Sequence, residues 1–272
     1  MKAYLIYALQ KLNLLLPIFR FHEWVKTARY SLSDRAKNNQ DKSGPDGLPL
    51  PPTKLIVLVA GDPSIMSFLR GGEMAANNIK NIFQNIDVQI NEFSAILDFG
   101  CGCGRVIRQF HSFAKMGVGI YGSDYNPVLI DWCQKELGFA NFSTNQLTPP
   151  LKFDDEKFDL IYSLSVFTHL PESLQSAWIN ELARILKPGG YLLFSTHGEA
   201  DFAMLNAAEK EKFRANELVV RYEEVSGTNM CAAFHPEIYV REQLTQGFEV
   251  MDFIFRGAYG NGYQDLWLLR KL

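Results

Sequence analysis

From residue 94 onward, short runs of apolar residues alternate with longer stretches in which apolar residues recur every three to four positions. The short runs predict buried strands at 94–100, 117–124, 141–144, 157–166 and 191–197. The longer stretches between them predict amphipathic helices at 104–116, 126–137 and 171–186. This alternation predicts an α/β fold built on a doubly wound, mostly parallel sheet.

The beginning of the chain follows a different pattern. Residues 1–19 are largely apolar, but Gln10, Lys11 and Asn13 interrupt the run, and Arg20 follows where a signal peptide would carry small residues. We therefore expect a helical extension, with no signal peptide and no transmembrane segment. One interpretation is that this helix docks on the main domain or on a partner subunit. The other is a basic amphipathic segment in weak contact with a membrane surface or an anionic partner.

Prolines mark the next boundary. The segment SGPDGLPLPP at 43–52 can sustain neither a helix nor a central strand and predicts a linker. Residues 53–60 predict an extended stretch, and two helical pieces follow, separated by Gly71 and Gly72 as by a helix C-cap. The predicted organisation is a helical extension and proline-rich linker at 1–52, a lid or pocket segment at 53–93, and a main domain at 94–272 with an insertion at about 199–246.

Charge and cysteine content narrow the possible partners. The net charge is −3 and the sequence pI is about 6.0, so nucleic acid is not an expected partner. Residues 1–42 hold eight Lys/Arg against three Asp/Glu, so the extension is basic and the remainder is acidic. Four cysteines in a chain of this length do not indicate a disulfide framework, and a cytoplasmic location is expected.

Three alternating glycines follow the first predicted strand in ILDFGCGCGR. Gly100, Gly102 and Gly104 allow a sharp backbone bend and the close approach of a ligand to the N–H groups of the next helix. A dinucleotide fingerprint would need its third glycine at position 105, where Arg105 stands. Asp98, at the head of the motif, would repel a pyrophosphate. It suits a positively charged group, such as an α-amino group or a sulfonium.

A second carboxylate ends the second predicted strand. Asp124 follows Gly104 by 20 residues, and a carboxylate in this place can accept hydrogen bonds from both hydroxyls of a ribose. The two carboxylates together favour a nucleoside joined to an amino acid, without phosphates. S-adenosylmethionine fits that description.

Four segments, ILDFGCGCGR, YGSDYNP, FDLIYSLSVFTHLP and LARILKPGGYLLFSTHG, resemble successive motifs of the class I S-adenosylmethionine-dependent methyltransferases, a family with a Rossmann-like fold. The resemblance covers residues 91–198, and residues 246–270 resemble the closing antiparallel hairpin of the same family. It implies a seven-stranded sheet, S-adenosyl-L-methionine as the cofactor, and transferase activity.

The resemblance also implies a cofactor site at the strand ends. Its members are Asp98, Gly100, Cys101, Gly102 and Gly104 around the methionine end, Asp124 and Tyr125 at the ribose and adenine, Asn145 and Gln146 near the adenine amino group, and Ser163 and Leu164 at the methyl-transfer centre. Cys101 would contribute its backbone. Asn145 and Gln146 stand where the family usually carries an acidic residue, and an amide can accept the same hydrogen bond.

Histidines are the candidates for catalysis. A base is needed only if the acceptor arrives protonated, as a hydroxyl does. His169, after the fourth strand, is the first candidate, with capping of a helix start as its structural alternative. His235, in the insertion, is the second candidate. Packing is favoured over catalysis for both His197 and His235. Cys101 and Cys103 have poor spacing for zinc, so no metal is expected.

The sequence thus predicts a methyltransferase acting on a small-molecule acceptor, such as a sugar or a specialised metabolite, with O-methylation favoured. One alternative is a non-catalytic domain that binds S-adenosylmethionine and serves as a scaffold. A nicotinamide-dependent oxidoreductase is disfavoured by Arg105. Transfer of an aminopropyl group is disfavoured because no carboxylates cluster around the fourth strand. No sequence motif indicates the acceptor atom or the oligomeric state.

Overall fold

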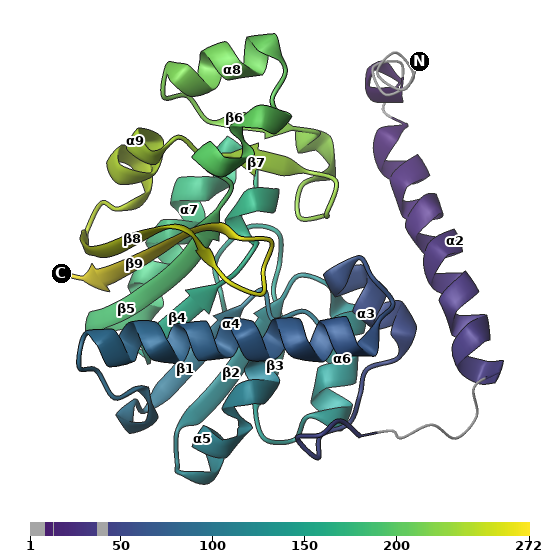
Figure 1. The fold of residues 1–272 in the computed structure, drawn as a ribbon, viewed down its shortest axis with the longest axis vertical. Coiled ribbons are helices and arrows are strands. Elements are labelled where there is room, and N and C mark those ends of the chain that lie inside the picture. Colours follow the sequence, from purple (N-terminus) through teal and green to yellow (C-terminus); the bar gives the residue numbers. More distant parts are fainter. Residues whose placement is uncertain (1–8, 13, 37–42) are drawn as a thin grey trace.

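A seven-stranded sheet runs through the computed structural model, which describes residues 9–12, 14–36 and 43–272 (Figure 1). The strand order is β3-β2-β1-β4-β5-β9-β8. The strands are β1 (Ala95–Phe99), β2 (Gly119–Asp124), β3 (Asn141–Thr144), β4 (Phe158–Ser163), β5 (Leu186–Thr196), β8 (Phe248–Ala258) and β9 (Gln264–Lys271). The first five pair in parallel, and β9 is antiparallel to both β5 and β8. The expected doubly wound sheet with a closing antiparallel hairpin is confirmed.

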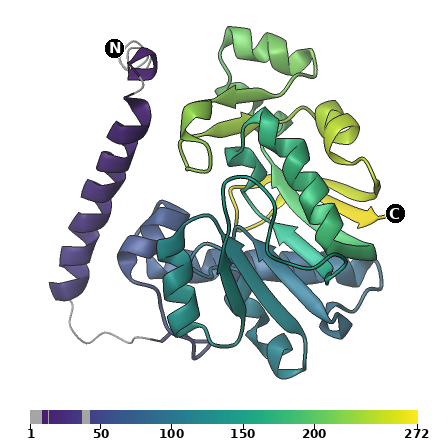
Figure 2. The same cartoon turned by 180° about the vertical axis from the view of Figure 1, so that it is seen from behind.

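Helices cover both faces of the sheet. They are α3 (Thr53–Ala60), α4 (Ile65–Asn85), α5 (His111–Lys115), α6 (Pro127–Glu136) and α7 (Glu172–Ile185), with short 3-10 turns η1 (Ile90–Glu92), η2 (Ile107–Phe110) and η3 (Phe167–His169). α4 lies on one face and α7 on the other (Figures 1 and 2). Ile96 of β1 packs in the core cluster of α4, and the next residue, Leu97, packs in that of α7. This alternation follows from the two-residue period of a strand.

An insertion between β5 and β8 adds a small second layer. It contains η4 (Glu199–Met204), α8 (Ala207–Arg214), β6 (Val219–Arg221), η5 (Glu223–Val225), β7 (Ala232–Phe234), α9 (Glu237–Tyr239) and the π-helical η6 (Val240–Leu244). β6 and β7 form an antiparallel hairpin with its own core of Phe213, Val219 and Phe234. A bridge between His197 and Phe234 joins this hairpin to the end of β5.

Helix α2 (Leu15–Ala36) stands at one side of the molecule (Figures 1 and 2). It packs on α3 and, near its N-terminal end, on the insertion, where Leu15 is buried with Val225 and Cys231. The expected helical extension is therefore present. In the part of the chain that the structure describes, no single helix is long and apolar enough to cross a membrane, although the bent pair α3 and α4 together meets that length and composition.

Two expectations for residues 53–93 are corrected. Residues 53–60 form helix α3, not an extended segment, because Leu55 and Ile56 are buried in a cluster with Phe68 and Leu129, which favours a helix over the β-propensity of the segment. Gly71 and Gly72 do not end a helix, because α4 continues through both. A Cβ at Gly72 would lie 2.0 Å from the carbonyl oxygen of Arg105, so the glycines allow α4 to approach the turn after β1.

The segment after the first strand is also less regular than expected. Residues 104–116 form η2 and the short α5 instead of one continuous amphipathic helix. Arg108, fully buried at the start of this segment, pairs with Asp46 of the proline-rich stretch, with 2.6 Å between Nε and Oδ2. The stretch at 43–52 is therefore anchored on the sheet domain. The division of the chain into three parts at residues 52 and 93 remains a prediction.

Candidate functional site

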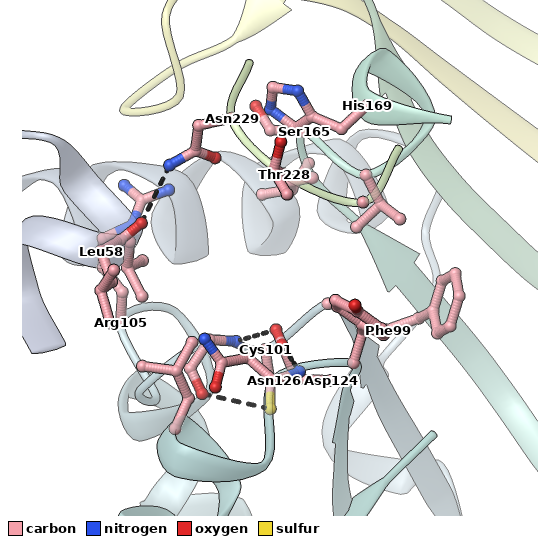
Figure 3. Close-up of a pocket in the computed structure, with 18 of the residues that line it drawn as sticks. Leu58, Phe99, Cys101, Arg105, Asp124, Asn126, Ser165, His169, Thr228 and Asn229 are labelled. Atoms are coloured by element: carbon pink, nitrogen blue, oxygen red, sulfur yellow. Dashed lines mark hydrogen bonds between the residues drawn. The ribbon is translucent and has the colours of Figure 1, made fainter. Parts of the chain in front are cut away.

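A cavity of about 500 Å³ opens at the carboxyl ends of β1, β2 and β4. The turn after β1, residues 124–126 and residues 164–166 form its walls, and α3, the loop at 227–229 and two residues of α2 close around them. Figure 3 shows Asp124 and Asn126 on one side of the cavity, with Ser165, His169 and Thr228 across from them. In doubly wound folds, ligands bind at this edge of the sheet. The volume lies within the range of small-molecule sites.

The glycine turn has the backbone that its sequence predicts. Gly100, Gly102 and Gly104 have φ values of 86°, 57° and 82°, in the left-handed region that favours glycine. A Cβ at Gly102 would lie 2.8 Å from Cγ2 of Val59 in α3, and one at Gly104 would lie 2.6 Å from Cδ1 of Leu137. Gly100 and Gly102 line the cavity, whereas Gly104 shapes the turn behind it.

Asp124 is fixed at the end of β2 by two backbone amides. Its Oδ2 accepts a hydrogen bond from the N–H of Gly102 at 2.8 Å, and its Oδ1 accepts one from the N–H of Asn126 at 2.8 Å. Burial raises the pKa of this carboxyl group, and the two amides oppose the rise. Each carboxylate oxygen has a further lone pair. Asp124 can therefore still accept hydroxyl groups from the cavity.

Asp98 is more deeply buried than Asp124, with 4% of its surface exposed. Burial raises its pKa to about 8, and the positive charge of Arg105 opposes this rise. The guanidinium of Arg105 donates to the carbonyl oxygen of Gly260 at 2.6 Å and to the side chain of Asn261. The cavity wall thus contains a carboxyl group that a cationic ligand would convert to its charged form.

The predicted adenine end also borders the cavity. Tyr125, Asn145 and Gln146 line it, but the amide of Asn145 already has partners. Its Oδ1 accepts from the hydroxyl of Ser123 at 2.8 Å, and its Nδ2 donates to the carbonyl oxygen of Gln146 at 2.7 Å. The side chain of Gln146 is therefore the better placed of the two to recognise a ligand.

His169 lines the cavity from η3. Its Nδ1 lies 2.7 Å from the carbonyl oxygen of Cys231, and a carbonyl can only accept, so this nitrogen carries the proton. Burial lowers the pKa of the ring, and the hydrogen bond to Cys231 opposes that change. The imidazole is therefore neutral near pH 7, with its Nε2 lone pair available to accept a proton.

Several predicted residues lie elsewhere. His235 is outside the cavity with 1% of its surface exposed, its Nε2 lies 3.3 Å from Oε1 of Gln175, and burial lowers its pKa to about 3. We therefore withdraw His235 as a candidate base. His197 pairs with Asp201 and stacks on Phe234. Cys101 and Leu164 do line the cavity, but Ser163 does not.

The structure adds lining residues that the sequence analysis did not assign. Ser165 has a φ of 60°, and its hydroxyl accepts from Nδ2 of Asn261 at 2.6 Å. Asn229 donates to the carbonyl oxygen of Leu58 at 2.9 Å and so links the insertion to α3 across the cavity (Figure 3). Ser165 directly follows Leu164, and Asn261 lies in a glycine-rich turn, so both had a local signal. Asn229 had none.

Among the described residues, no group of three or more His, Cys, Asp or Glu side chains could hold a metal ion. The two cysteines of the glycine turn, Cys101 and Cys103, are free thiols that are buried in the protein interior. Burial raises the pKa of each of these thiols well above the usual value.

Comparison with known sequences identifies the central part of the chain. Residues 97–194 match a family model described as a methyltransferase domain. A tRNA N(3)-cytidine methyltransferase from Gallus gallus is 27% identical over 154 residues, which are 53% of this chain and 41% of that protein. A ubiquinone biosynthesis O-methyltransferase from Coxiella burnetii is 30% identical over 104 residues, 37% of this chain and 42% of that protein. The chain thus spans less than half the length of these curated relatives.

Solved structures show the same fold. An S-adenosylmethionine-dependent methyltransferase from Methanosarcina mazei superposes with a TM-score of 0.52 at 23% identity, covering 70% of this chain and 97% of that one. A magnesium protoporphyrin IX methyltransferase from Synechocystis, solved with S-adenosylhomocysteine bound, gives 0.51 at 19% identity, covering 76% and 87%. At these identities the likeness concerns the fold.

Proposed function

We propose that this chain is a class I, Rossmann-like S-adenosylmethionine-dependent methyltransferase that transfers a methyl group to a small-molecule acceptor in the cavity. Residues 97–194 match a family model described as a methyltransferase domain, and the sheet has the fold of a solved enzyme of that class. The observation that carries the proposal is the position of Asp124. Its carboxylate is held by two amides beside the glycine turn and still faces a cavity of about 500 Å³.

The residues around the cavity fit the three parts of S-adenosylmethionine. Asp124 offers oxygens for the ribose hydroxyls, and Gln146 and Tyr125 border the place for the adenine. Gly100 and Gly102 keep side chains away from the methionine end, where the buried carboxyl group of Asp98 compensates positive charge. When bound, the cofactor supplies a methyl group already activated on a sulfonium.

The protein's contribution is then alignment, exclusion of water and, for a hydroxyl acceptor, removal of a proton. His169 is the proposed base. Its Nδ1–H donates to the carbonyl oxygen of Cys231, so Nε2 is the atom that would take the proton from the hydroxyl of the methyl acceptor. Ser165 and Asn261, on the same side of the cavity, are proposed to position the acceptor.

A small acceptor agrees with the charge of the protein. The Gallus gallus relative is a tRNA N(3)-cytidine methyltransferase, whereas the Coxiella burnetii relative is a ubiquinone biosynthesis O-methyltransferase. This chain has a net charge of −3 and a pI of about 6.0, which do not favour binding to the phosphate backbone of tRNA. We propose O-methylation of a small molecule, and we expect the reaction in the cytoplasm.

A labelling experiment tests the acceptor class. The purified chain is incubated with S-adenosylmethionine carrying a tritiated methyl group and, separately, with a lipid extract, a polar metabolite extract and total tRNA. We expect label in a small-molecule extract and none with Asp124→Ala, while Asp131→Ala, an exposed aspartate on α6, retains transfer. Label in tRNA alone would refute the small-molecule proposal, and binding without any transfer would favour a scaffold.

A further inference from the structure

Helix α2 is apolar on two opposite sides, of which one is buried against the protein and the other is exposed. The inner side packs on the protein: Leu15 is 3% exposed among Val225 and Cys231, with Leu16 beside it. On the same helix, Arg20 and Glu23 line the cavity. α2 therefore lies along the cavity, with its inner side toward the body of the protein.

The outer side of α2 carries a second apolar row. Leu14, just before the helix, and Ile18, Phe21 and Val25 within it follow one another at spacings of four, three and four residues. That spacing places them in one stripe, because a helix has 3.6 residues per turn. They are 42%, 45%, 64% and 45% exposed. In both views, no described element lies beyond α2 on the side that faces away from the sheet (Figures 1 and 2).

Basic residues accompany the stripe. The exposed side chains of α2 include His22 and Arg29, whereas Arg20, also exposed, lines the cavity on the inner side. Residues 1–42 carry eight Lys/Arg and three Asp/Glu, a balance of +5, in a chain whose net charge is −3, so the rest of the molecule is negative. An anionic surface would attract this segment and repel the remainder, which fixes the orientation of the molecule with α2 toward the surface.

We propose that α2 is an interfacial helix that lays the stripe of Leu14, Ile18, Phe21 and Val25 on an anionic membrane surface. An apolar stripe flanked by cationic side chains is the pattern of helices that lie in the plane of the membrane interface. A second copy of the chain is a poorer occupant, because pairing two α2 stripes would bring two basic segments together. The inference goes beyond the proposed function and does not depend on it.

Vesicle flotation of the full chain tests the proposal. The probes are vesicles of phosphatidylcholine alone and vesicles with about 25% phosphatidylglycerol, at low salt and at about 0.5 M salt. We expect binding to the anionic vesicles, weakened at least about tenfold by high salt and by the double variant Ile18→Glu with Val25→Glu. The matched control, Met116→Glu with Met204→Glu, adds the same charge at residues 61% and 62% exposed away from α2 and leaves binding unchanged.

Three results would overturn the inference. The first is failure of the wild type to float with anionic vesicles. The second is an equal loss of vesicle binding in the α2 variant and its control. The third is a dimer in solution that only the α2 variant dissociates. Titration of the same proteins with S-adenosylmethionine separates the two proposals. Retained cofactor binding without vesicle binding refutes the membrane surface alone, whereas absent cofactor binding refutes the proposed function.

Discussion

Two carboxyl groups of different character face the cavity at the ends of adjacent strands. Asp124 is held by backbone amides, whereas burial raises the pKa of Asp98 to about 8. Near pH 7 Asp98 is therefore mostly protonated in the free protein. A ligand with a sulfonium favours its ionised form, because opposite charges in a buried site attract strongly.

The first prediction concerns this proton. Binding of S-adenosylmethionine at pH 7 should release a proton from Asp98, and affinity should rise with pH up to about 8. Calorimetry in phosphate and in Tris buffer measures the released proton as a difference in apparent enthalpy. The proton release should disappear in Asp98→Asn. An enthalpy that is independent of the buffer in the wild type would show that Asp98 does not compensate the ligand charge.

A second prediction concerns the turn between β1 and η2. Gly102→Ala should weaken S-adenosylmethionine binding at least about tenfold, because the residue has a φ of 57° and its Cβ would lie 2.8 Å from Val59. Gly138→Ala is the matched control, since a Cβ there meets nothing within 4 Å. Equal affinities of the two variants in equilibrium dialysis would show that the turn tolerates a side chain.

The third prediction tests His169 as a base. With a hydroxyl acceptor, His169→Gln should lower kcat about a hundredfold while the Kd for S-adenosylmethionine stays the same. Because burial lowers the pKa of His169, the rate should fall only at pH values below its usual pKa of about 6.5. Unchanged kcat in the variant would assign His169 to packing with Cys231.

At the scale of single residues, the sequence was sufficient to predict where residues at the ends of the strands lie. Asp98 and Asp124 end adjacent parallel strands, so their meeting at one edge follows from the order of elements. His235 lies in the insertion as expected but outside the cavity, because its position depends on how the insertion folds back on η3 and α7. No local pattern encodes such a contact. Asn229 was missed for the same reason.

Helices and strands were predicted correctly where the spacing of apolar residues was clear. They were missed where contacts with other elements determine the secondary structure. Helix α6 begins as expected, with Asn126 accepting from the N–H of Val128 at 3.0 Å and Pro127 in the first turn. α3 was predicted as extended because Ile56, Val57 and Val59 are β-branched. Its burial between α4 and α6 overrides that local preference. Gly71 and Gly72 likewise allow α4 to approach the turn after β1, a contact that the spacing of apolar residues does not indicate.

A prediction at this scale concerns the contact between the proline-rich stretch and η2. Asp46→Asn should destabilise the protein by about 3 kcal/mol, since it removes the charge that compensates the fully buried Arg108. Burial alone would raise the pKa of Asp46, but Arg108 lowers it overall. The stability from this pair is thus present above the unfolded pKa of about 3.9 and is lost as the pH falls through the lowered value.

Urea unfolding at pH 7 measures this change in the free energy of unfolding. Asp62→Asn is a suitable control, because Asp62 is exposed in the turn between α3 and α4. A change below about 0.5 kcal/mol in Asp46→Asn would show that the stretch at 43–52 contributes little to stability.

At the scale of the whole molecule, the alternation of strands and helices was sufficient to predict the sheet. Right-handed parallel connections leave few ways to arrange the strands, and the carboxyl edge of β1, β2 and β4 then gathers the predicted site. The position of α2 beside the cavity was not predictable, since its inner contacts come from α3 and the insertion. Its composition did indicate a basic helical segment.

The central claim is that this cavity binds S-adenosylmethionine through Asp124, and calorimetric titration tests it most directly. The account predicts micromolar binding to the wild type and to Asp131→Ala. In Asp124→Ala binding should weaken at least about tenfold, because hydrogen bonds to a charged acceptor each contribute about 1.5–3 kcal/mol. Absence of binding to the folded wild type, or equal binding to Asp124→Ala, would contradict the account.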